Sequence, residues 1–172
     1  MVMVTLKEQK LKEVMSNEHF GYEVGMLTET CKRLETLRIE DTILANALIE
    51  SFCIHARILV DFFNGRRGVK AKEVTLETYQ PFQSGQVRQA LTEKLNTQIA
   101  HLTLNRTSVA SEKIGPDDRK ELFDAIMAEL QIFKMHLKRE YRSIVLARTL
   151  LIPTNAGSGG IVNIVRWIPT LH

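Results

Sequence analysis

The sequence predicts an all-α, single-domain helical bundle of about five main helices, with the helix over residues 42–64 in the centre. Apolar residues recur at three- and four-residue steps through most of the 172-residue chain. Capping residues and turn residues separate these segments. The length fits one domain, and 44% hydrophobic and 25% charged residues are ordinary for a globular chain. We therefore divide the chain into a helical domain at 1–152 and a Gly/Ser linker with an apolar arm at 153–172.

The first two helices are predicted over residues 5–15 and 18–37. The first is short and weakly amphipathic, whereas the second carries a regular apolar stripe. Cys31 and Cys53 both lie on apolar helical stripes. They could pair as a disulfide, but in a cytosolic protein we expect reduced thiols in the core. The stripe of the second helix consists of Phe20, Val24, Leu27, Cys31 and Leu34.

The central helix over residues 42–64 is apolar around most of its circumference, which is typical of a helix in the middle of a bundle. Asp41 or Thr42 is expected to cap it, and Asn64-Gly65 to end it. The expected inward stripe is Leu44, Leu48, Ser51, His55, Ile58 or Leu59, and Phe62, widened by Ala47, Ile54 and Phe63.

In the second half of the chain, the sequence pattern predicts an irregular connection at 66–84, a helix over 86–105 and a long final helix. The helix over 86–105 carries Val87, Leu91, Leu95 and Leu102 on one face. Pro116, followed by two aspartates, is a strong helix start, and the apolar period then continues to about residue 151. Pro153 ends this helix.

Four polar residues interrupt the apolar pattern of the central helix. Glu50, Arg57 and Asp61 share one face, and His55 stands on the adjacent apolar stripe. One interpretation is an internal ion-pair network with a hydrogen-bonded core histidine. The other is an active centre, which requires an opening to solvent beside these residues.

A second polar group lies in the segment NTQIAHLTLNR, which contains Asn96, His101, Asn105 and Arg106. A partly buried His101 would exchange protons near neutral pH, and Arg106 would hold an anion. The alternative is a border histidine bonded to a backbone carbonyl. The candidate catalytic residues are therefore His101, Arg106, His55 and Arg57, and the candidate polar network is Glu50, Asp61, Asn96 and Asn105.

Several motifs with known chemistry are absent from the sequence. It contains no glycine-rich phosphate loop, no GxSxG, no CxxC, no HExxH and no paired Glu-x-x-His. We therefore expect neither a metal nor a cofactor.

Positive charge is concentrated in two segments. Residues 65–72 carry four Lys or Arg and no acid, and residues 134–148 carry five against Glu140, so with a net charge of +3 the remainder is acidic. Such a concentration is typical of a protein with a polyanionic partner, although a solvated helix end and loop would look the same. The candidate nucleic-acid-binding residues are Arg66, Arg67, Lys70, Lys72, Arg139 and Arg142.

The segments ALIESFCIHARILVDFFN and EKLNTQIAHLTLNR resemble an uncharacterised group of all-helical bacterial proteins. The shared pattern is ESF-x-x-HAR-x-x-x-x-FF followed by KxN-x-x-IAHLT-x-x-R, and the resemblance covers roughly residues 40–135. The helical layout is also loosely similar to HEPN-like bundles, which bind nucleotides or cleave RNA and are usually dimeric. Their ribonucleases carry an arginine, then four to six intervening residues, then a histidine. Here His101 precedes Arg106, with four residues between them, which departs from that pattern.

These observations favour a cytoplasmic, nucleic-acid-associated protein that binds or processes RNA or DNA as a homodimer; a divergent HEPN-like nuclease is its most specific form. The alternative is a non-enzymatic protein–protein interaction module with a structural polar cluster, and whether the protein is an enzyme is left open. A small-molecule pocket lined by His55 and Phe62 is a third hypothesis. No apolar run is long enough to span a membrane, so no membrane association is expected.

Overall fold

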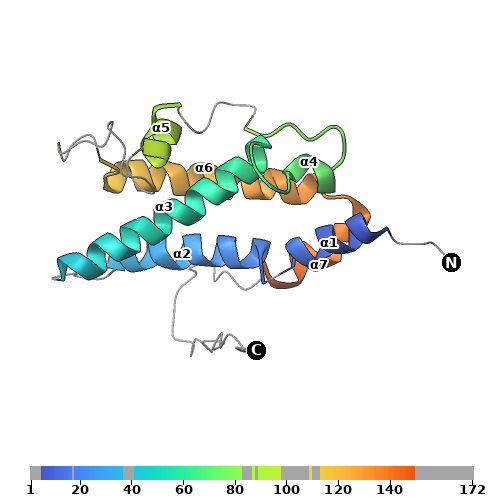
Figure 1. The fold of residues 1–172 in the computed structure, drawn as a ribbon, viewed down its shortest axis with the longest axis horizontal. Helices are drawn as coiled ribbons and strands as arrows, with labels where there is room; N and C mark the ends of the chain where they lie inside the picture. The colour runs from blue at the N-terminus through green and yellow to red at the C-terminus, as the bar shows by residue number, and fades with distance from the viewer. Residues whose placement is uncertain are drawn as a thin grey trace, which may run out of the picture.

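The computed structural model describes residues 5–16, 18–36, 41–82, 87, 89–97, 109 and 113–149, and this part of the chain is an all-α bundle. Figure 1 shows α3 crossing α2 on one side and α6 on the other. The helices are α1 (Leu6–Val14), α2 (Phe20–Thr36), α3 (Thr42–Asn64), α4 (Ala71–Val74), α5 (Gln89–Thr97), α6 (Pro116–His136) and α7 (Arg139–Thr149). The predicted fold class is confirmed.

Local signals fix the ends of α3. The Asp41 carboxylate accepts hydrogen bonds from the backbone N–H groups of Ile43 and Leu44 at 2.8 and 3.3 Å, which satisfies two donors of the first turn. Gly65 ends the helix in the left-handed conformation with φ +67°. Both ends agree with the prediction.

An aromatic cluster forms the centre of the core. Phe20 from α2, Phe62 and Phe63 from α3, and Phe133 from α6 pack with ring centroids 5.1 to 5.6 Å apart. Tilted and edge-to-face ring pairs at such distances are favourable. The thiols Cys31 and Cys53 are free and buried, and burial raises their pKa to about 11 and about 12.

The buried face of α3 differs from the predicted stripe. His55 and Phe62 are buried as expected, together with Phe52, Ala56 and Leu59. The exposed residues of the predicted face are Leu44, Ala47, Ile54 and Ile58. Helix α3 is central, as predicted, since it packs against α2, α4, α5 and α6. The stripe differs because these partners leave one side of α3 open in the described chain.

Length and composition alone would allow α3 to cross a membrane, since its most apolar 18-residue stretch has a mean hydropathy of 1.6. This corrects the expectation that no segment reaches that length. Core helices of soluble proteins meet the same criterion, although only 33% of this stretch is buried.

The long final helix predicted from Pro116 to about residue 151 is also wrong, because it is divided into α6 and α7. Leu137 leaves the helical conformation (φ −57°, ψ 136°) and pairs with Thr75 in an isolated antiparallel bridge. No glycine or proline marks this break in the sequence. Of the predicted helix over 86–105, the structure describes the part that forms α5, Gln89–Thr97. The arm at 153–172 lies outside the described residues.

Candidate nucleic-acid interface

The bridge between Thr75 and Leu137 joins the chain just after the first basic segment, 65–72, to the second basic segment, 134–148. The Leu76 N–H donates to the His136 carbonyl at 2.9 Å, and the Lys138 N–H donates to the Val74 carbonyl at 3.0 Å. Paired backbone groups of this kind fix the two segments relative to each other. The segment that follows α4 and the turn between α6 and α7 therefore lie side by side.

Helix α1 lies at the same end of the molecule as α4, α7 and the end of α6 (Figure 1). We call this surface the basic end and define it by ten cationic residues. All are exposed except the half-buried Lys134 and Lys138. They are Lys7, Lys10, Arg66, Arg67, Lys70, Lys72, Lys134, Lys138, Arg139 and Arg142.

Several of these cations are held in place by the chain itself. The Lys138 ammonium donates to the Glu73 carbonyl at 2.8 Å, and the Arg142 Nε–H donates to the Leu137 carbonyl at 2.9 Å. The Arg67 side chain, 71% exposed, lies 3.8 Å from the mostly buried carboxylate of Asp61. Lys138 and Arg142 form no ion pair within the described residues, so these bonds to neutral carbonyls leave their charges uncompensated there.

Glu73 is the acid most closely placed among these cations. Its carboxylate accepts the Lys70 N–H at 2.9 Å and lies 3.2 Å from the Lys7 ammonium. The backbone hydrogen bond from Lys70, followed by Lys7, lowers the pKa of Glu73. Arg66, Lys72 and Arg139 form no ion pair within the described chain.

An open groove runs between α1 and the segment that precedes α4. Its volume is about 530 Å³. The floor is apolar, and Lys7 and Lys10 stand along it. The lining residues are Leu6, Lys7, Lys10, Leu11, Val14, Gly68, Val69 and Glu73.

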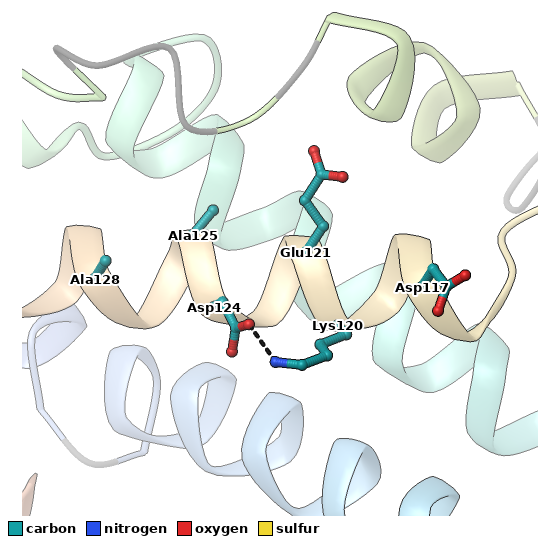
Figure 2. A pocket seen from close by; sticks show the side chains of 6 residues that line it. All are labelled: Asp117, Lys120, Glu121, Asp124, Ala125 and Ala128. Atoms are coloured by element: carbon teal, nitrogen blue, oxygen red, sulfur yellow. Dashed lines mark hydrogen bonds and ion pairs between the residues drawn. The ribbon is translucent and has the colours of Figure 1, made fainter.

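A second hollow, of about 520 Å³, lies on α6 and has the opposite charge. Figure 2 shows the Lys120–Asp124 ion pair, at 2.6 Å, pointing away from the side on which Glu121 lies. Asp117 stands one turn before Glu121. Because acids dominate this surface, it does not suit a polyanion.

The candidate catalytic residue His55 is buried and bonded to another helix. Its Nδ1 lies 2.6 Å from the Glu23 carboxylate of α2, and the ring of Tyr22 meets it edge-on at 5.5 Å. The side chain of His55 is 9% exposed. This geometry is that of a hydrogen-bonded core histidine, and the sequence did not indicate Glu23 as its partner.

Glu50, Arg57 and Asp61 do share one face of α3, as predicted, but they do not form one buried network. Glu50 is exposed, and Arg57 and Asp61 are half-buried. Within the described residues Arg57 and Asp61 form no ion pair, and Asp61 lies nearest Arg67. These residues are therefore not joined with His55 in one cleft.

Of the four remaining candidate site residues, the structure describes one, Asn96. Asn96 is half-buried on α5. His101, Asn105 and Arg106 lie outside the described residues. Among the described side chains, no group of three or more His, Cys, Asp or Glu is placed to hold a metal ion.

Glu129 of α6 is a fully buried carboxylate that the sequence pattern did not indicate. It accepts the Tyr79 hydroxyl at 2.5 Å and the Phe82 N–H at 2.9 Å. Burial and this carboxylate raise the pKa of Tyr79 well above its usual range. The available signal was spacing, because Glu129 follows Leu122 and Ile126 at helical steps on the inward face.

The lysines of α1 were missed as well, because Glu8 and Glu13 balance them in the sequence.

Comparisons with protein-family models, curated proteins and solved structures gave no match. The chain is therefore assigned to no family.

Proposed function

We propose that this protein binds nucleic acid through the basic end. The supporting observation is that the Thr75–Leu137 bridge brings together two cationic segments that are distant in the sequence. A polyphosphate backbone is bound by exposed Lys and Arg that replace its counterions. Such contacts carry no sequence information, so the proposed binding is not sequence-specific.

The groove beside α1 fits the same ligand. Lys7 and Lys10 would contact phosphates, while the apolar floor formed by Leu6, Leu11 and Val69 would pack against a sugar or a base. A ligand in this groove would lie between the lysines of α1 and the arginines of the loop after α3.

The test is a fluorescence-anisotropy titration of labelled RNA and DNA oligonucleotides over a series of salt concentrations. We expect binding that weakens steeply with salt. The double variant Arg66→Glu/Arg67→Glu should weaken binding by at least about tenfold and reduce the slope of log K against log salt by about two.

The matched control is Lys32→Glu/Lys113→Glu, which makes the same charge change at exposed lysines of α2 and of the segment before α6. This control should retain most of the affinity. Binding that ignores salt, no binding at low salt, or equal losses in both double variants would contradict the proposal.

Nucleic-acid cleavage is the enzymatic form of this proposal, with His101 as acid or base and Arg106 as anion holder. A wild-type protein that cleaves labelled RNA, and a His101→Ala variant that binds it without cleaving, would support this form. Intact RNA after incubation with the wild-type protein would limit the function to binding.

The alternative, a non-enzymatic interaction module, is favoured by one observation. The buried polar residues His55 and Glu129 are bonded inside the chain, which is what a structural role requires. A His101→Ala variant with unchanged folding, self-association and ligand affinity, in a protein that does not cleave RNA, would support this alternative.

A further inference from the structure

The open side of α3 carries a regular stripe of residues that neither pack into the core nor belong to the basic end. Its residues follow one another at alternating four- and three-residue steps, which is the spacing of a seam between two paired helices. Ile58 lies beside this stripe. The seam residues are Ile43, Ala47, Glu50, Ile54 and Arg57.

The apolar part of this stripe is exposed to water. Ile43 is 81% exposed, Ile54 45% and Ile58 42%, and the neighbouring Leu44 is 49% exposed. Large aliphatic side chains scattered singly over a surface are normal, but a contiguous group on one helix indicates a contact surface.

The charges on this stripe show what kind of partner it fits. Glu50 lies four residues before Ile54, and Arg57 lies three residues after it. In the described chain neither forms an ion pair. They are about 10 Å apart along α3, so they do not reach each other within one helix.

A two-fold axis through Ile54 would bury the exposed apolar residues of this stripe and would also give Glu50 and Arg57 partners of opposite charge. In an antiparallel pair of α3 helices, Glu50 of each copy comes beside Arg57 and Ile58 of the other copy. The face is therefore self-complementary, which is the requirement of an isologous interface. A lipid surface fits less well, since charged residues occupy the middle of the stripe.

We propose that two copies of this chain pair through the open face of α3, antiparallel, with the axis at Ile54 and reciprocal Glu50–Arg57 ion pairs. This proposal does not depend on nucleic-acid binding. The contact surface is one helix face, so we expect a dimer that dissociates on dilution.

The test is sedimentation equilibrium over a concentration series. The wild-type protein should dimerise, and Ile54→Glu should be monomeric. Glu50→Arg and Arg57→Glu should each weaken the dimer by at least about tenfold, because like charges then oppose each other. An equimolar mixture of these two variants should restore association, since both ion pairs form again in the heterodimer.

Met135→Glu is the matched control, because Met135 is 68% exposed on α6, away from this face, and its substitution should leave the dimer unchanged. Circular dichroism and urea unfolding establish that each variant is folded. A monomeric wild type, a dimer indifferent to Ile54→Glu, or a mixture that does not associate would overturn the proposal. A monomer that co-sediments with phosphatidylcholine vesicles would overturn it in favour of a lipid surface.

Discussion

Glu129 has no exposed surface, yet it is a carboxylate in the core of the bundle. A buried charge is tolerated only where hydrogen bonds replace water. Tyr79 and the backbone of Phe82 supply these bonds from the segment that follows α4. Phe82 has a positive φ of 46°, a conformation that non-glycine residues rarely adopt. Glu129 therefore attaches the chain that follows the basic loop to α6.

Removal of the Tyr79 hydroxyl should destabilise the protein. In Tyr79→Phe one oxygen of the buried Glu129 carboxylate loses its donor, at a cost of about 1–3 kcal/mol in the free energy of unfolding. Urea denaturation measures this loss. Tyr141→Phe is the control, because Tyr141 is also buried but its hydroxyl has no hydrogen bond among the described residues. Equal losses in the two variants would show that the bond to Glu129 contributes nothing.

Partners across helices were the part of the site that the sequence did not predict. His55 was recognised as a residue of the apolar stripe, but its partner Glu23 comes from 32 positions earlier. Helical periodicity relates residues within one turn or two, so it does not identify such pairs. The same limit applies to Tyr79 and Glu129.

At the level of the helices, prediction succeeded where the signal is local. Asp41 and Gly65 mark the ends of α3, and Pro116 marks the start of α6. The break at Leu137 has no local signal. It is imposed by packing, because buried Leu137 pairs with Thr75, and this long-range contact overrides a continuous apolar period.

The same substitution should have opposite effects at two glycines. Gly25 lies inside α2, and an added Cβ would meet nothing within 4 Å, so Gly25→Ala should raise the free energy of unfolding by up to about 1 kcal/mol. Gly65 has φ +67°, where alanine is strained, so Gly65→Ala should lower it by about 1 kcal/mol.

Urea or guanidinium denaturation of the two variants beside the wild type is the measurement. A destabilising Gly25→Ala would indicate a close helix approach that the structure does not show. A neutral Gly65→Ala would indicate that α3 ends without the left-handed residue.

For the whole molecule, the sequence predicted two basic segments but not that they meet. Each segment is visible in the composition, whereas their proximity depends on the α6–α7 break, which was not predicted. The result is a cationic end on a chain of modest net charge, +3. Such a concentration of charge attracts anions at a distance more strongly than the net charge suggests.

If the basic end is one binding surface, cations from both segments should contribute to the affinity for the same oligonucleotide. Arg139→Glu should weaken binding by a factor similar to that of Arg66→Glu, measured by anisotropy at one salt concentration. Lys113→Glu is the control outside this surface. A normal affinity in Arg139→Glu would place the α7 cations outside the interface.

Helix α3 continues without a break from its open face to Gly65, where the basic loop begins. In the antiparallel pairing that we propose, the last residue of each α3 lies about 15 Å from the axis, so the two basic ends are about 30 Å apart. A strand long enough to reach both would be held by avidity, whereas a short oligonucleotide would engage only one. The length of this helix would thus set the shortest nucleic acid that the protein retains firmly.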